Sequence, residues 1–189
     1  MRKSLKNFNP DKIAVLETRT WHAYYHHQFL KLFFLLVRLM HEFFDLNYLH
    51  AVRVAYYSAS ATIDFRLNKG KENQEIIQRI TKKLTQFYLF ISNHSLETFD
   101  HEKAAKLEIE WWLVDRYPSR YGISREEAIK MPIALIYDVD SSKLNEYAEN
   151  RARAMVLQDE AEIEHREADW KRIEFLLRFA YGSLRSAIQ

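Results

Sequence analysis

Two histidines near the N-terminus have a spacing that suits metal binding. His22 and His26 are four residues apart, and side chains with this spacing lie on one face of an α-helix. Two imidazoles presented in this way can ligate one transition-metal ion. The same spacing also arises by chance, especially beside His27, and histidines on helix faces are usually hydrogen-bonded structural residues. Metal ligation by His22 and His26 is therefore one of two interpretations that the sequence leaves open.

Two carboxylates fall on the otherwise apolar face of a predicted helix over residues 101–117. Glu108 and Asp115 are seven residues apart, which places them two turns apart on one face. His101 extends the same line by another two turns. That face also carries Trp111 and Trp112. Burying a charge costs several kcal/mol unless the charge is paired, so this line predicts either a buried ion-pair network or the polar lining of an internal site.

An arginine interrupts the inner face of the predicted helix over residues 142–160. Arg151 lies in the middle of an apolar stripe made by Leu144, Tyr147, Ala148 and Met155. The planar guanidinium group binds a carboxylate with two parallel hydrogen bonds. We therefore expect Arg151 to pair with Glu108 or Asp115. A purely structural network of this kind is the simplest explanation of all three charges.

The first predicted helix adds a further carboxylate and several aromatic residues. Glu17 lies at the edge of its polar stripe, two turns before Tyr24. Adjacent aromatic residues such as Tyr24 and Tyr25 have two interpretations. One ring packs in the core and the other at its edge, or both form the wall of a pocket for a flat or apolar ligand. The candidate ligand-binding residues are Glu108, Asp115, Arg151, Trp111, Trp112, Glu17 and Tyr24.

Composition excludes several classes of function. The 189 residues include no cysteine, so disulfides, thiolate nucleophiles and cysteine-based metal sites are excluded. The net charge of +2 is too small to indicate a nucleic-acid partner. The longest uninterrupted apolar run in the sequence, Leu32–Val37, is far shorter than the roughly 20 residues that a membrane-spanning helix needs. The basic first residues lack the apolar stretch of a secretory signal, so we expect a cytoplasmic protein with no membrane or nucleic-acid partner.

The scarcity of turn residues predicts an all-α fold. Only three glycines and three prolines occur, which disfavours β-hairpins and favours long helices. We expect one domain, a bundle of six to seven helices around a long, largely buried first helix, preceded by a flexible basic tail at residues 1–10. The apolar periodicity places the helices at about 11–44, 48–68, 72–92, 101–117, a short segment after Ser124 that Pro132 interrupts, 142–160 and 166–187.

Two functions remain open at this point. The first is a bundle that binds a small molecule or a metal at the Arg/carboxylate/aromatic cluster, with no cofactor specified and enzymatic activity undecided. For this site we expect the Glu17–His26 end of the first helix to face the line of His101, Glu108 and Asp115. The second is a non-enzymatic interaction or scaffolding bundle, which predicts that every buried charge is paired and that one helix face is apolar and exposed. Homo-oligomerisation is compatible with both.

Overall fold

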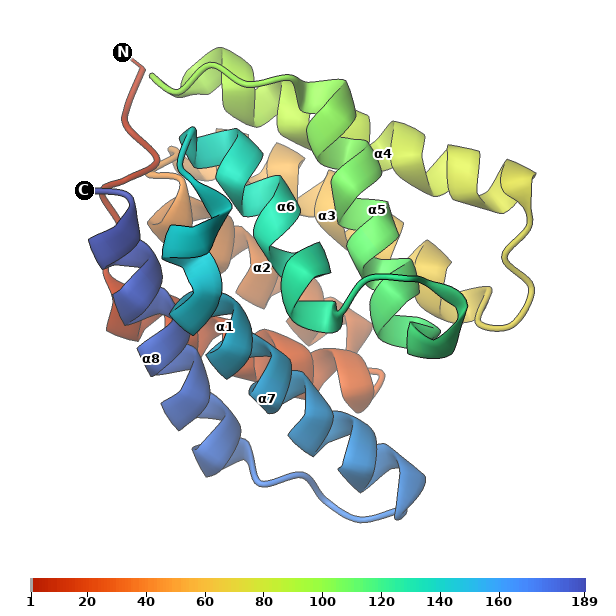
Figure 1. The fold of residues 1–189 in the computed structure, drawn as a ribbon. Helices are drawn as coiled ribbons and strands as arrows, with labels where there is room; N and C mark the ends of the chain where they lie inside the picture. The colour runs from red at the N-terminus through yellow and green to blue at the C-terminus, as the bar shows by residue number, and fades with distance from the viewer. Residues whose placement is uncertain (1) are drawn as a thin grey trace.

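The computed structural model of this protein describes residues 2–189 and is all-helical in that range. It contains eight α-helices, more than the six to seven expected, with two short 3₁₀ segments between them (Figure 1). The helices are α1 (Pro10–Tyr25), α2 (Phe29–Phe43), α3 (Tyr48–Leu67), α4 (Gln74–His94), α5 (His101–Arg116), α6 (Arg125–Tyr137), α7 (Asn145–Ile163) and α8 (Trp170–Ala187).

Each helix packs against the next one along the chain, and α8 returns to pack against α1. In Figure 1, the blue helices α7 and α8 lie beside the red α1, while α4 and α5 lie on the opposite side of the bundle. Short connections favour contact between consecutive helices. The contact between α1 and α8 is the one that joins the two ends of the chain, and it therefore positions N-terminal side chains against C-terminal ones.

The long first helix expected over residues 11–44 is two helices. His27, between Tyr25 and Phe29, has a φ of 56°, in the left-handed region. A right-handed helix cannot continue through that conformation, which costs a non-glycine residue about 1–2 kcal/mol. The break lets α1 and α2 pack against each other, and this burial offsets the cost of the turn.

The second half of that segment, α2, is also less buried than we expected for the first helix. Leu32 and Leu36 of α2 are buried, but Leu30 is 73% exposed and Phe34 is 62% exposed. An apolar stripe nearly all round a helix favours burial on several sides, and here one of those sides is left uncovered.

Helix starts follow the local sequence more closely. The Ser124 side chain accepts a hydrogen bond from the Glu127 amide at the start of α6, and Asp100 caps α5 in the same way. Pro132 does not interrupt α6, which continues to Tyr137. Proline removes one backbone hydrogen bond, and packing of α6 against both α5 and α7 holds the helix together around that gap.

The N-terminal segment is packed against the bundle, in contrast to the flexible tail that we expected. Leu5 and Phe8 are buried, and Arg185 of α8 donates a hydrogen bond to the Phe8 carbonyl. Burial of two large apolar side chains stabilises the segment by about 1.5–3 kcal/mol for each. The basic composition of the N-terminal segment was therefore not enough to predict whether it packs against the bundle.

No helix within residues 2–189 combines the length and the apolar character that crossing a membrane requires.

Candidate metal centre and buried polar network

Glu17 of α1 and Arg151 of α7 are buried charges that form a bidentate ion pair. Arg151 Nη1 lies 2.9 Å from Glu17 Oε2, and Nη2 lies 2.5 Å from Oε1. The Tyr181 hydroxyl of α8 accepts a hydrogen bond from Arg151 Nη1 at 3.1 Å and donates one to Glu17. Each charged side chain is only 8% exposed. The prediction that Arg151 pairs with Glu108 or Asp115 is wrong, because no local sequence pattern indicates that Arg151 of α7 meets Glu17 of α1.

Aromatic rings surround this ion pair. The guanidinium carbon of Arg151 lies 5.0 Å from the ring centre of Trp111 and 5.6 Å from that of Trp21. Arginine above an aromatic face gains a favourable cation–π interaction. Burial alone would lower the pKa of Arg151, but the neighbouring Glu17 carboxylate raises it well above its usual value. The Arg151 guanidinium therefore keeps its charge, and the pair is enclosed by protein.

Glu108 belongs to a different environment from Arg151. Its carboxyl group is half-buried and accepts hydrogen bonds from the Tyr88 hydroxyl at 3.1 Å and the Trp112 indole at 3.0 Å. No ion pair involves Glu108 within residues 2–189. Burial raises the pKa of Glu108 to about 7, against the lowering effect of the Tyr88 hydrogen bond and the charge of Arg151. Glu108 is therefore partly protonated at neutral pH.

Asp115 lies in a third environment, between α5 and the start of α6. Arg125 Nε is 2.7 Å from Asp115 Oδ1, and Arg125 Nη2 is 2.7 Å from Asp159 Oδ2. Burial raises the pKa of Asp115 to about 6, partly opposed by the charge of Arg125. Tyr24 has a different partner. The centre of its ring lies 4.6 Å from the guanidinium carbon of Arg66.

The structure thus divides the predicted ligand-binding set. Glu17, Arg151 and Trp111 come together, whereas Glu108 with Trp112 and Asp115 have separate partners. Helix α1 packs on α2 and α8 rather than on α5, so the expected approach of its Glu17–His26 end to the line of His101, Glu108 and Asp115 has no support in the helix contacts. Sequence reasoning missed the partners that complete these clusters, namely Tyr181, Tyr88, Arg125 and Asp159.

His22 in the last turn of α1 and His26 directly after that helix meet Glu167 from the loop between α7 and α8. Glu167 Oε1 is 3.3 Å from His26 Nε2 and 4.0 Å from His22 Nε2. The two imidazole rings are 4.2 Å apart between centres. Across the described residues, these three side chains form the one group of histidines and acids whose ligand atoms all lie within 4.8 Å of one another.

Trp170, the first residue of α8, holds this group in place. Its ring centre is 5.0 Å from that of His22, and its indole N–H donates a hydrogen bond to Glu167 Oε1. This hydrogen bond, together with the one to His26, lowers the pKa of Glu167 below its ordinary value. Burial and the neighbouring His26 lower the pKa of His22. The carboxylate is therefore ionised and His22 is neutral at pH 7, the forms in which both groups bind a metal.

The separations within this group fit a tetrahedral ion. Ligand bonds of about 2.1 Å at a tetrahedral metal place the ligand atoms about 3.4 Å apart. The His26–Glu167 distance of 3.3 Å matches this separation, and the His22–Glu167 distance of 4.0 Å is somewhat longer. The three side chains are between 36% and 60% exposed, so an ion can reach them from solvent.

A surface groove of about 550 Å³ adjoins this group between α1, α2 and α8. Its walls are made by Thr18, Arg19, His22, Lys31, Leu35, Trp170, Lys171 and Glu174. His22 and Trp170 thus belong both to the groove and to the histidine–glutamate cluster. A fourth ligand of a bound ion can enter from this side.

Comparison with protein-family models, curated proteins and solved structures gave no significant match to this chain.

Proposed function

We propose that this protein binds a divalent transition-metal ion through His22, His26 and Glu167. The convergence of these three side chains from segments 141 residues apart in sequence supports the proposal most strongly. Imidazole and carboxylate ligands suit zinc, iron, cobalt and nickel. Hydrogen bonding of the ligating carboxylate by Trp170 is the outer-shell support that protein metal sites commonly have.

Three protein ligands leave a fourth position of a tetrahedral ion for water or a small molecule. The groove beside His22 gives that position access to solvent. We therefore propose that a small molecule that binds the metal lies in this groove. For Arg151 and Glu17 we propose a structural role, because their hydrogen bonds are directed at each other and at Tyr181.

The test is a calorimetric titration of the purified, chelator-treated chain with Zn²⁺, repeated with Co²⁺. We expect one ion per chain, and at least a 100-fold weaker affinity in the double variant His22→Ala/His26→Ala. The matched control is His50→Ala/His94→Ala, which removes a second close histidine pair, with ring centres 4.5 Å apart. That control keeps the affinity of the unaltered chain. Equal affinity in the two double variants would refute the site.

A second candidate function is recognition of another protein, and the exposed apolar residues of α2 and α3 favour it. These neighbouring helices expose Leu30, Phe34, Tyr48, Leu49, Val52 and Tyr56 by 45–84%. Large apolar residues gathered on a surface are typical of interaction sites. Lys31, Arg38 and Arg53 lie on the same helices and take part in no ion pair within residues 2–189, so we propose a partner whose contact surface is apolar with an acidic rim.

Co-purification tests this second function when two kinds of variant are compared. Leu49→Gln removes an apolar contact, and Arg38→Gln/Arg53→Gln removes the charge complementarity. Ile163→Gln is the control, because Ile163 is 77% exposed at the end of α7. We expect one acidic partner in stoichiometric amount that both kinds of α2–α3 variant lose and the control keeps. A dimer of this chain in light scattering, or a partner that all variants retain, would contradict the proposal.

A further inference from the structure

We propose that the groove beside the metal ligands binds an anion with an apolar tail, of which a medium-chain carboxylate is the simplest example. This proposal rests on the proposed metal site and adds the chemical class of its ligand. It has three elements: the charge of the groove, its continuation along α2, and the position of the metal ligands at one end.

The groove is positively charged. Arg19, Lys31 and Lys171 line it, are exposed, and make no ion pair or side-chain hydrogen bond anywhere in residues 2–189. The acidic residue in its wall, Glu174, is already bound to Arg178 at 2.9 Å. Three uncompensated cations around one hollow attract an anion, and a metal ion at His22 would add to that attraction.

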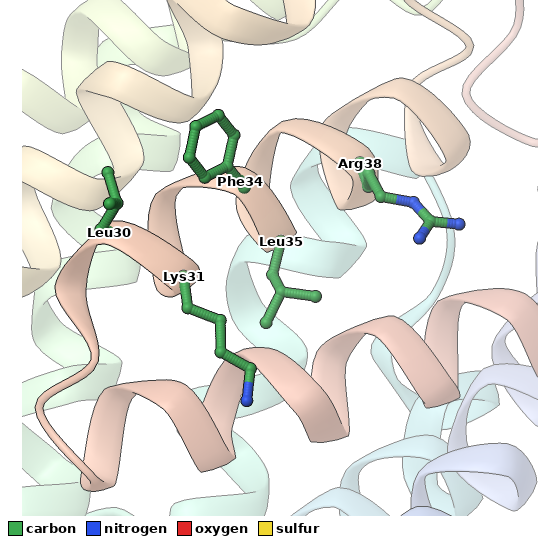
Figure 2. A pocket seen from close by; sticks show the side chains of 5 residues that line it. All are labelled: Leu30, Lys31, Phe34, Leu35 and Arg38. Carbon is green, nitrogen blue, oxygen red and sulfur yellow. The ribbon is translucent and has the colours of Figure 1, made fainter.

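A second, shallower hollow of about 450 Å³ continues the groove along α2. Leu30, Lys31, Phe34, Leu35 and Arg38 line it (Figure 2). Lys31 and Leu35 line both hollows, so the two hollows meet at these side chains. In Figure 2, Lys31 and Leu35 point toward the neighbouring helix, whereas Leu30 and Phe34 lie on the other side of the α2 ribbon.

The polar and apolar parts of this continuous surface are separated around α2. His22 and Lys171 line the first hollow, and the exposed Leu30 and Phe34 line the second, on the other side of the α2 ribbon. Lys31 and Leu35 line both hollows. An anionic head at Lys31 and the metal thus leaves its tail to lie across α2, over Leu35 and toward Phe34 and Leu30.

A tail on this surface gains affinity by leaving water. Each methylene group that is fully buried strengthens binding about fourfold. The second hollow is open, so only part of a tail is covered there, and we expect octanoate to bind at least about tenfold more tightly than acetate. The two probes carry the same head group, so this ratio measures the apolar contact alone.

The test uses the full chain loaded with Co²⁺ and titrated with octanoate, acetate or octanol, with affinity followed by calorimetry and by the visible spectrum of Co²⁺. We expect octanoate to bind most tightly and to shift the Co²⁺ spectrum. Phe34→Gln should reduce the octanoate preference, while Lys31→Gln/Lys171→Gln should weaken octanoate at least tenfold and keep the Co²⁺ affinity within about threefold. Arg153→Gln, which removes an exposed cation on α7, is the control and should match the unaltered chain.

The outcomes separate this proposal from the metal site itself. Absence of Co²⁺ binding refutes the metal site, and this inference with it. Normal Co²⁺ binding with equal affinity for octanoate and acetate, or octanoate binding that is insensitive to Lys31 and Lys171, refutes the ligand class alone. Vesicles of phosphatidylcholine with phosphatidic acid distinguish the source of the anion: binding to vesicles that Phe34→Gln weakens assigns it to a lipid, and binding to monomeric octanoate alone assigns it to a free carboxylate.

Discussion

Arg151 and Glu17 form a bidentate ion pair in the interior of the bundle, although 134 residues separate them along the chain. The pair joins α7 to α1, and the Tyr181 hydroxyl adds α8 to the same hydrogen-bonded cluster. A cluster of this kind fixes the relative positions of three helices, because the charges are stable in the interior only when all partners are in place.

Removing one member of that pair is expected to destabilise the fold strongly. Glu17→Gln leaves the Arg151 charge buried without its counter-ion, which costs about 3–5 kcal/mol. The double variant Glu17→Met/Arg151→Met removes both charges and should cost much less. Urea unfolding measures these free energies. Glu149→Gln, in the exposed pair with Arg153, is the control and should change stability by less than about 0.5 kcal/mol. Equal losses in Glu17→Gln and in the double variant would contradict a favourable pairing.

Glu108 is expected to make stability depend on pH. Burial raises the pKa of Glu108 to about 7 in the folded chain, from an ordinary value of 4.5. The folded state therefore binds the proton more tightly, so this contribution to stability is full below about pH 4.5 and disappears as pH rises through 7. Between pH 5 and pH 8, Glu108→Gln should gain about 1–2 kcal/mol relative to the unaltered chain, since partial solvent access reduces the full effect.

Urea unfolding at the two pH values measures this gain for Glu108→Gln. Glu146→Gln replaces an exposed glutamate on α7 and serves as the control: its stability relative to the unaltered chain should differ by less than about 0.5 kcal/mol between the two pH values. If Glu108→Gln behaves like the control, Glu108 titrates as an ordinary surface carboxylate.

Trp170 is expected to act on the metal through Glu167. Trp170→Phe keeps the aromatic contact with His22 and removes the indole N–H that holds the carboxylate. Loss of such a hydrogen bond weakens metal binding about 10- to 100-fold. Calorimetry with Zn²⁺ measures the loss, and thermal unfolding without metal checks that the fold is retained. Trp112→Phe, which removes an indole N–H bonded to Glu108, should leave the Zn²⁺ affinity unchanged; a loss there as large as in Trp170→Phe would argue against a local effect.

Asp138 is expected to be a site of stabilisation. This residue ends α6 in the left-handed conformation, with a φ of 51° and a ψ of 55°. Glycine adopts that conformation without the steric cost of a side chain. Asp138→Gly should therefore stabilise the fold by about 0.5–1 kcal/mol, or raise the melting temperature by about 1–4 °C. Asp140→Gly, which removes the cap of the following 3₁₀ segment, should lower the melting temperature instead.

Periodicity in the sequence predicted the fold class and most helix faces. The apolar repeat of the helix over 166–187 places Trp170, Ile173, Leu177, Ala180 and Leu184 on one face; the last four are fully buried, and Trp170 is half-buried. The break at His27 was not predicted, because no glycine or proline marks it. The left-handed conformation there is stabilised by the packing of α1 on α2, and such packing has no local signature.

The candidate metal site likewise has a part that the sequence predicts and a part that it does not. The HxxxH spacing of His22 and His26 was enough to predict that two imidazoles share one helix face, because helix geometry alone decides which side chains are neighbours four residues apart. The third ligand, Glu167, lies in a loop 141 residues beyond His26. Only the contact between α1 and α8 brings it there.

The sequence by itself thus determined the all-α class, most of the helical segments and which charged side chains fall on apolar helix faces. Those properties depend on contacts within a few residues and on the 3.6-residue repeat of the helix. Only the tertiary structure decided that Arg151 pairs with Glu17, that Glu108 is hydrogen-bonded without a counter-ion, and that Glu167 meets two histidines. These pairings depend on which helices touch, and that choice is made by the packing of the whole core rather than by any local pattern.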